Sequence, residues 1–255
     1  MQEPPLRLHR PAGERLLVSM ATYNERDNLA PLVAAISEQL PDAHILVTDD
    51  NSPDGTGAIA DELSARDPRV RVLHRPGKLG LGTAILGAMR YAIERDYDLF
   101  LNIDADFSHP PRYLPALVAG MATHDVMIGS RYIPGGGTQD WPWSREMMSR
   151  SVNRFVRLAM RMPVRDASGG FRCYRVATLQ AANLDAVRSR GYSFQQEVLF
   201  RCYLAGARIG EVPIVFENRK SGASKVSVAE SVRSLSMLSW LGMRATLGLE
   251  RGKAA

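Results

Sequence analysis

Short apolar runs alternate with longer segments of helical periodicity along the first half of the chain. The apolar runs predict strands at 16–20, 44–48, 70–74, 99–106 and 125–130. Apolar side chains at helical spacing predict helices at about 28–39, 56–65, 81–95 and 111–123. Because strands and helices alternate and the polar connections are short, the pattern favours right-handed βαβ units. The sequence therefore predicts an α/β protein with a mostly parallel central sheet flanked by helices.

Polar and charged side chains follow several of these strands at the point where each strand ends. They are the segment 23–25, the pair 49–50, the pair Asp104 and Asp106, and Arg131. Ligands of parallel sheets bind in the crevice outside the carboxyl ends of the strands. We therefore expect these side chains to converge on one crevice, and the chain up to about residue 130 to form a nucleotide-binding unit.

Asp104 and Asp106 are candidates for a metal site. If the strand that begins at 99 extends through them, residues two apart point to the same side, so both carboxylates face one spot. Two like charges so close are costly unless a cation lies between them. Mg²⁺ or Mn²⁺ would suit, because such ions take oxygen ligands and keep positions open for water and phosphate oxygens. The alternative is a polar turn that caps the next helix.

Two glycine-containing segments are candidates for contacts with phosphate. The segment 77–83 matches neither a Walker loop nor a dinucleotide fingerprint, so it predicts a tight turn and a helix start, with Lys78 as a candidate phosphate contact. The segment 219–225 places three cations and two hydroxyls around a glycine, a composition suited to a diphosphate. The alternative for this second segment is a solvated charge cluster.

The pattern changes from residue 133 onwards. Residues 134–137 are typical of a flexible loop, and the segment 141–162 interleaves Trp, Phe and Met side chains with arginines. These arginines are Arg145, Arg150, Arg154, Arg157 and Arg161. An amphipathic helix with arginines on one side and apolar residues on the other suits a membrane surface with anionic headgroups. The alternative is a core helix with a solvated basic face.

The remainder of the chain predicts one more helix and one more strand. We expect a polar loop at 166–172, a helix at 192–205 and a strand at 208–216. The tail at 226–249 is apolar on more than one face, so it needs burial on two sides. A membrane, a second subunit or the protein core would each meet that need.

Composition restricts the class of protein. The 255 residues carry a net charge of +5, which favours an anionic partner such as a nucleotide, a nucleic acid or an acidic lipid surface. Only Cys173 and Cys202 occur, so the sequence predicts neither a disulfide framework nor a thiolate zinc site, and a reducing cytosol is the expected setting. It also predicts no secretory signal and no apolar run of the about 20 residues that cross a bilayer.

Several short motifs occur together in one order. They are Thr22-Tyr23-Asn24-Glu25 with Asn28-Leu29, Asp49-Asp50-Asn51-Ser52-Pro53-Asp54-Gly55-Thr56, Gly80-Leu81-Gly82-Thr83, Asp104-Ala105-Asp106, Gly129-Ser130-Arg131-Tyr132, and 219–225. In this combination the chain resembles family-two inverting glycosyltransferases, and among them the polyprenol-phosphate (dolichol-phosphate) mannosyltransferases. The resemblance extends over about 16–225.

The resemblance implies a GT-A fold, a nucleotide-sugar donor, Mg²⁺ or Mn²⁺, and a polyprenyl monophosphate acceptor. It implies a GT-A domain at 16–225, with a nucleotide-binding part at 16–131 and an acceptor part at 132–225. An extension at 1–15 would precede this domain, and an amphipathic helix and tail at 226–255 would follow it.

The resemblance also implies roles for particular residues. Those implied to bind the donor are Ala21, Tyr23, Glu25, Thr48, Asp50, Asp104, Ala105, Asp106, Arg131, Arg219 and Lys225. Asp104, Asp106 and Arg131 are implied to be catalytic, and Asp104, Asp106 and Ser108 to bind the metal. Two positions depart from the family pattern: Ala21 stands where proline is usual, and Ser108 stands where some members have a metal-binding glutamine.

The expected activity is therefore transfer of mannose from GDP-mannose to a polyprenyl phosphate by a peripheral protein on the cytoplasmic face of the membrane. One alternative is a glucosyltransferase that uses UDP-glucose, or a related transferase with a sugar hydroxyl as acceptor. Another is a non-catalytic protein that binds nucleotides or nucleic acid in a basic crevice. Acid pairs at two strand ends argue against that second alternative, and we expect no nucleic-acid partner.

Overall fold

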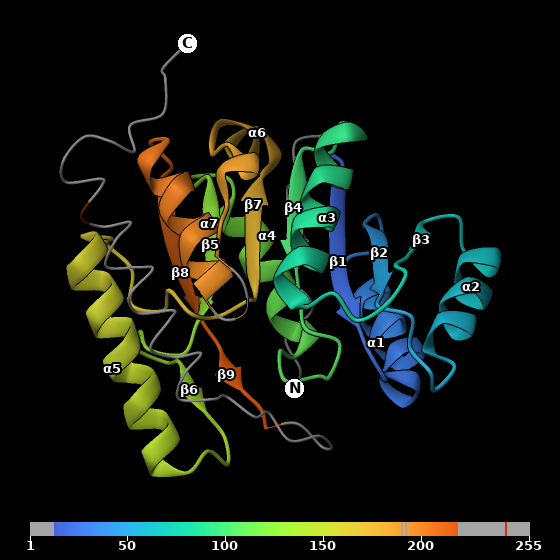
Figure 1. Ribbon diagram of the computed structural model, residues 1–255, viewed down its shortest axis with the longest axis horizontal. Coiled ribbons are helices and arrows are strands. Elements are labelled where there is room, and N and C mark those ends of the chain that lie inside the picture. Colours follow the sequence, from blue (N-terminus) through green and yellow to red (C-terminus); the bar gives the residue numbers. More distant parts are fainter. Residues whose placement is uncertain (1–12, 190, 192, 219–242, 244–255) are drawn as a thin grey trace, which may run out of the picture.

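A seven-stranded sheet runs through the middle of the protein, and helices cover both of its faces (Figure 1). The computed structural model describes residues 13–189, 191, 193–218 and 243. The strands of this sheet, in spatial order, are β3 (Val70–His74), β2 (His44–Asp49), β1 (Leu16–Thr22), β4 (Leu99–Asn102), β7 (Arg172–Arg175), β5 (Val126–Ser130) and β8 (Ile209–Pro213). Only β7 runs antiparallel to its neighbours in this sheet, so the expectation of a mostly parallel sheet is confirmed.

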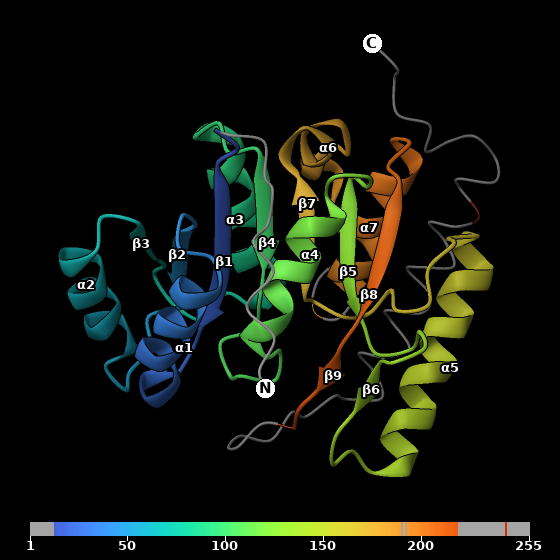
Figure 2. The same cartoon turned by 180° about the vertical axis from the view of Figure 1, so that it is seen from behind.

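The helices form two layers that the two views show in turn. In Figure 1, α3 (Leu81–Glu94), α6 (Val176–Ala181) and α7 (Ser193–Leu204) lie over the near face. Figure 2 shows α1 (Arg26–Gln39) and α4 (Leu114–Gly120) over the opposite face. The other helices are α2 (Thr56–Arg66), α5 (Trp143–Met160) and the short 3₁₀ turns η1 (Pro111–Tyr113) and η2 (Leu184–Ala186).

The strands β1, β2 and β4 in the middle of the sheet are buried on both faces because helices cover each face. Leu17 and Phe100 belong to the core on the α3 side, whereas Leu16, Val18 and Leu101 belong to the core on the α1 side. All five side chains are almost completely buried. Continuous apolar runs of this kind are what a parallel sheet between two helical layers requires.

Most predicted elements of the first half are confirmed, with two differences at their ends. The strand expected at 99–106 stops at Asn102, and residues 105–107 form a turn in which Phe107 has φ +60°. The helix expected at 111–123 is instead a 3₁₀ turn followed by the seven-residue α4.

The second half differs more from the expectation. The strand β7 and the helix α6 were not predicted, and the expected strand at 208–216 is split in two. Pro213 ends β8, after which β9 (Val215–Phe216) leaves the main sheet and pairs with β6 (Gly137–Thr138). The strand β6 begins at Gly137, the last residue of the loop expected at 134–137. The expected helix at 192–205 is present as α7, although Tyr192 lies outside the described residues.

The helix predicted in the segment 141–162 is present as α5, but its faces differ from the expected division. It buries Asn153, Val156 and Met160 against the protein, as the core-helix alternative requires. Its outer surface mixes arginines with large apolar side chains, of which Trp143 is 76% and Leu158 64% exposed. None of the helices that the structure describes combines the length and hydrophobicity that a bilayer-spanning helix needs.

Candidate active site

The carboxyl ends of β1, β2 and β4 lie at one edge of the sheet. In the parallel register Thr22 is opposite Asp49, and Ser19 is opposite Asn102. From β1 the chain moves outward through β2 to β3 and then returns to place β4 on the other side of β1. The crevice at such a switch in strand order is where open α/β sheets bind their ligands.

The two carboxylates that follow β2 have different environments. Asp49 is held inside the protein: its Oδ1 accepts hydrogen bonds from Thr22 Oγ1 at 3.0 Å and from Ser52 Oγ at 2.5 Å. Asp50 instead forms an ion pair with Arg75 at 2.8 Å and accepts a hydrogen bond from Leu79 N at 3.2 Å. The first acid is therefore structural, and the second connects β2 to the glycine-rich turn.

The glycine-rich segment forms the tight turn that we expected. Gly80 has φ +97°, and the Thr83 hydroxyl donates to the carbonyls of Leu79 and Gly80 at the start of α3. Lys78 lies with its Nζ 4.0 Å from the centre of the Tyr23 ring, at the edge where β1 ends. The segment thus brings a cation to an expected nucleoside-binding side chain.

The other expected nucleoside contacts also lie at this edge. Ala21 and Thr48 are directly opposite each other in the last part of β1 and β2. Thr48 Oγ1 is buried and has no hydrogen-bond partner within the described residues, so it is a polar atom that a ligand could satisfy. Glu25 accepts a hydrogen bond from Asn28 Nδ2 at 2.8 Å at the start of α1.

Asp104 and Asp106 lie in the turn after β4 and not on an extended strand, so the argument from strand alternation was wrong. The turn gives the two carboxylates different surroundings. The Asp104 side chain is 28% exposed, whereas Asp106 is buried and its Oδ1 accepts hydrogen bonds from Ser108 N at 3.1 Å and Ser108 Oγ at 2.6 Å. Ser108 therefore orients the Asp106 carboxylate.

The donor set of this turn fits a hard divalent cation. Within the described ranges, no three His, Cys, Asp or Glu side chains are grouped closely enough to enclose a metal ion. Asp104 and Asp106 nevertheless supply carboxylate oxygens, and Mg²⁺ commonly binds through one or two carboxylates together with water and substrate phosphates. The turn thus suits an ion whose remaining ligands come from a diphosphate.

His109 is a site residue that the sequence analysis missed. It is buried, stacks on Phe171 with ring centres 5.0 Å apart, and meets Phe216 edge-on at 5.1 Å. Its Nδ1 lies 3.4 Å from Asp104 Oδ2. Burial lowers the pKa of His109, with Asp104 opposing the shift, so the imidazole is neutral at physiological pH. The only sequence signal was its position three residues after Asp106.

Arg131 is fixed by a buried ion pair that the sequence analysis also missed. Its Nε and Nη2 each lie 2.7 Å from a carboxylate oxygen of Asp166, which is fully buried. Burial acts to lower the pKa of Arg131, but the Asp166 carboxylate outweighs it and raises that pKa. The guanidinium also donates to Ser168 Oγ at 2.8 Å. Arg131 is thus a rigid cation whose electrostatic environment includes Asp104.

Asn153 links α5 to this ion pair. Its Oδ1 accepts hydrogen bonds from Ala167 N at 2.8 Å and Ser168 N at 3.1 Å, and its Nδ2 donates to Ser168 Oγ at 2.9 Å. Because Ser168 also accepts from Arg131, one buried asparagine connects the helix to the candidate catalytic arginine. An asparagine among arginines and apolar residues gave no signal in the sequence.

The expected phosphate-binding cations Arg219 and Lys225 and the expected helix of the tail lie outside the described residues, apart from Met243. Their contribution to the site, like the division of the chain into an extension, a catalytic domain and a tail, stays a prediction.

Replacing Gly129 with alanine is expected to destabilise the fold by about 1–3 kcal/mol through overpacking. A Cβ there would lie 2.8 Å from the ring of Phe171, which is fully buried and supports His109. Gly87→Ala is the matched control: its nearest neighbour is 4.0 Å away, and a helical alanine should add about 0.5–1 kcal/mol. Urea unfolding of both variants measures the difference, and equal effects would contradict the packing argument.

Comparison with known proteins places this geometry in context. A family model described as "Glycosyl transferase family 2" matches residues 17–181. An undecaprenyl-phosphate mannosyltransferase of Micrococcus luteus is 43% identical over 242 residues, which cover 92% of this chain and 100% of that protein. A polyprenol monophosphomannose synthase of Mycolicibacterium smegmatis is 42% identical over 241 residues, which cover 94% of this chain and 91% of that protein.

Solved structures resemble this chain at lower identity. Glucosyl-3-phosphoglycerate synthase from Mycobacterium tuberculosis, in complex with Mn²⁺, UDP and phosphoglyceric acid, has a TM-score of 0.61 and 18% identity. The match covers 93% of this chain and 80% of that chain. At this identity the likeness concerns the fold alone.

Proposed function

Because this chain belongs to glycosyl transferase family 2, we propose that it transfers a mannosyl group from GDP-mannose to the phosphate of a polyprenyl monophosphate, with inversion at the anomeric carbon. The family and the GT-A fold that its motifs led us to expect are confirmed. The observation that carries the proposal is the 43% identity, over 92% of this chain, to a relative named undecaprenyl-phosphate mannosyltransferase.

We assign the donor nucleoside to the edge between β1 and β2. The features that support this assignment are the Thr48 hydroxyl, which has no hydrogen-bond partner among the described residues, the Asp50 carboxylate, and the Tyr23 ring that Lys78 contacts. Ala21 and Glu25 complete the expected pocket at the end of β1 and the start of α1. Arg219 and Lys225 are proposed to bind the charged groups of the donor.

We assign the donor diphosphate and a divalent metal ion to the turn after β4. Asp104 and Asp106 would hold Mg²⁺ or Mn²⁺, with Ala105 between them. Ser108, which the resemblance implied as a third metal ligand, is proposed here to orient Asp106 through its hydrogen bond to Oδ1. A bound ion there would supply positive charge against the negative charge that grows on the departing nucleoside diphosphate. The buried Arg131–Asp166 pair keeps a second cation fixed near Asp104, so no reorganisation is needed as charge develops.

The acceptor chemistry explains why the site needs no strong general base. A phosphate monoester is already an anion at neutral pH, and its oxygen can attack the anomeric carbon without losing a proton. His109 is buried and neutral, so it contributes packing behind Asp104 and no charge. The demand on the protein is to hold two anions and a sugar in one geometry, which the rigid turn and ion pair favour.

We further propose that the protein associates peripherally with the cytoplasmic face of a membrane. A polyprenyl phosphate acceptor lies in a bilayer, and α5 exposes large apolar side chains beside arginines. Both cysteines are free and buried, and the absence of a disulfide between them fits the reducing cytosol.

Incubating the protein with radiolabelled GDP-mannose, polyprenyl phosphate and Mg²⁺ tests the function, with organic extraction of the product. We expect label in the organic phase, its loss in excess EDTA, and its recovery with Mg²⁺ or Mn²⁺. Full activity in EDTA would refute the role of the metal.

A donor panel separates mannosyl transfer from the alternatives. If UDP-glucose is a better donor than GDP-mannose, the glucosyltransferase alternative is favoured. If label appears in a water-soluble product when a free sugar is supplied, a sugar hydroxyl is the acceptor. Binding of nucleotide without any transfer would favour a non-catalytic protein.

A further inference from the structure

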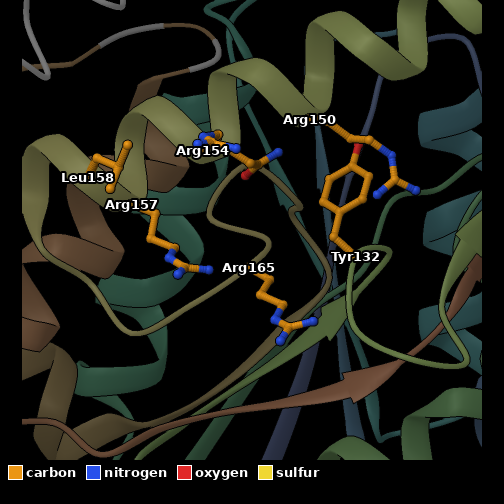
Figure 3. Close-up of a pocket in the computed structure, with 7 residues that line it drawn as sticks. Tyr132, Arg150, Arg154, Arg157, Leu158 and Arg165 are labelled. Carbon is orange, nitrogen blue, oxygen red and sulfur yellow. The ribbon is translucent and has the colours of Figure 1, made fainter.

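A pocket of about 390 Å³ opens beside α5, outside the proposed catalytic turn (Figure 3). Its walls come from α5, from the residue after Arg131 and from the loop between α5 and β7. The lining residues are Tyr132, Arg150, Asn153, Arg154, Arg157, Leu158 and Arg165. Asp104, Asp106 and Arg131, the residues assigned to the reaction, do not line this pocket, which we call the arginine pocket.

The arginine pocket concentrates positive charge that is only partly neutralised. Arg150 pairs with Glu146 at 2.7 Å. In the part of the chain that the structure describes, the side chains of Arg154, Arg157 and Arg165 form no ion pair. Figure 3 shows Arg157 extending from α5 toward Arg165, whereas Arg150 lies beside the Tyr132 ring. Like charges gathered in this way repel one another unless an anion lies between them.

The floor of the arginine pocket is rigid. Tyr132 donates a hydrogen bond to Ser149 Oγ at 2.6 Å, and its ring centre lies 4.9 Å from the Arg150 guanidinium carbon. Asn153 is buried and uses both ends of its amide in hydrogen bonds to the 166–169 loop. A fixed aromatic ring and a fixed amide therefore support guanidinium groups, whose planar forks suit the oxygens of a phosphate.

The helix that carries the arginines also exposes a set of large apolar side chains. They are Trp143, Met147, Met148, Phe155 and Leu158, of which Leu158 itself lines the pocket. A cluster of guanidiniums next to exposed apolar side chains matches the boundary of a bilayer, where phosphates lie directly above the acyl chains. A soluble phosphate compound would gain nothing from the apolar side chains.

We propose that the arginine pocket binds the phosphate of an anionic phospholipid headgroup, while the apolar side chains of α5 enter the acyl region below it. The proposal rests on the proposed function only in that the acceptor is a membrane lipid. It differs from general attraction between a basic protein and an acidic surface, because it requires one headgroup in one site. Asn153 lies on the floor of this site and also holds the loop of Asp166, so a bound headgroup would fix α5 relative to Arg131.

Calorimetric titration with dihexanoyl phosphatidylglycerol, below its micelle concentration, tests the site without vesicles or transfer activity. We expect saturable binding of one lipid per protein, and no saturable binding of dihexanoyl phosphatidylcholine. R154Q/R157Q should weaken the binding by about tenfold or more, because two of the guanidiniums are lost. Inorganic phosphate should bind much more weakly than the lipid; equal affinity would overturn the assignment to a lipid headgroup.

Two further variants distinguish the pocket from diffuse charge. R154K/R157K keeps both charges but loses the planar forks, so we expect a loss of about fivefold. R161Q removes one charge from the end of the same helix but lies outside the pocket, and it should bind within about twofold of the wild type. Wild-type affinity in the lysine variant, or an equal loss in R161Q, would refute the site.

The same variants separate this proposal from the proposed function. In detergent micelles R154Q/R157Q should transfer mannose at the wild-type rate, whereas on phosphatidylglycerol vesicles its rate should fall about tenfold. If no transfer is found with any variant, the calorimetric results still decide whether the lipid site exists. A lower rate in detergent would place these arginines in the catalytic site and overturn the proposal.

Discussion

Replacing Asp106 with asparagine is expected to lower kcat for mannosyl transfer by about a thousandfold, with little effect on the fold. Asp106 is buried in the turn after β4, and Ser108 fixes its Oδ1 through two hydrogen bonds. An asparagine keeps the shape but loses the charge that would hold a metal ion. The loss falls on kcat because the ion acts on the charge that develops as the diphosphate departs.

Ser108→Ala should have a smaller effect in the same direction. It leaves both carboxylates in place and removes only the hydroxyl that orients Asp106, so a decrease of about 10- to 100-fold and a weaker apparent affinity for Mg²⁺ are expected. Titrating activity against Mg²⁺ measures both effects.

Asp185→Asn serves as the matched control, because that carboxylate is exposed and, among the residues that the structure describes, pairs only with Arg90. It should keep full activity and stability. If Asp106→Asn kept more than about a tenth of wild-type kcat with the same metal dependence, Asp106 would not be a metal ligand.

Most strands of the first half could be predicted because β1, β2, β4 and β5 are buried on both faces. The runs at β1 and β2 are bounded by polar turns, and continuous apolar strands of this kind are what a parallel sheet covered on both faces requires. The edge strand β3 is only partly buried. Because ligands bind at the carboxyl ends of parallel strands, the sequence also predicted that Asp50 and Asp104 lie at the same edge of the sheet.

Elements that depend on contacts distant in the sequence could not be predicted in the same way. The strand β7 runs antiparallel between β4 and β5, and its four residues, Arg-Cys-Tyr-Arg, have no strand-like alternation. Arg172 is fully buried only because the carbonyls of Ala167 and Gln195 accept its hydrogen bonds. A sequence pattern shows an arginine there but does not show these carbonyls.

The same limit applies to the candidate site. The pair Asp104 and Asp106 was identified by its spacing, although the structure replaces the expected strand with a turn. Asp166 is 35 residues from Arg131 in the sequence, and its local motif is an ordinary polar loop. Its role is visible only once β5 and the 166–169 loop are adjacent.

Replacing Asp166 with asparagine is expected to lower the free energy of unfolding by about 3–5 kcal/mol and to impair transfer as well, because it leaves Arg131 buried without its counter-charge. The Asp166 carboxylate accepts hydrogen bonds from Arg131 N, Nε and Nη2 and from Gly169 N at 3.1 Å. Urea unfolding and mannosyl transfer measured on the same preparation give the two effects. Unchanged stability would mean that the pair does not hold the loop in place.

The pH dependence of the difference in unfolding free energy between wild type and Asp166→Asn gives an independent test. Burial acts to raise the pKa of Asp166, but Arg131 outweighs it, so the pKa in the folded protein lies below the ordinary value of 3.8. Its contribution to stability is therefore present above about pH 3.8 and is lost as the pH falls through the lower folded value. Asparagine does not titrate, so the stability difference between wild type and variant should be constant near neutral pH and shrink below pH 3.8.

A double variant separates the structural role of the ion pair from its role in the reaction. In R131M/D166N both charges are absent, methionine and asparagine have volumes close to those of arginine and aspartate, and the asparagine Oδ1 can still accept from the backbone N–H groups of this loop, so most of the lost stability should return. Transfer should not return, because the cation beside Asp104 is gone. If the double variant regained activity together with stability, Arg131 would serve only to hold the fold, and its place among the catalytic residues would be wrong.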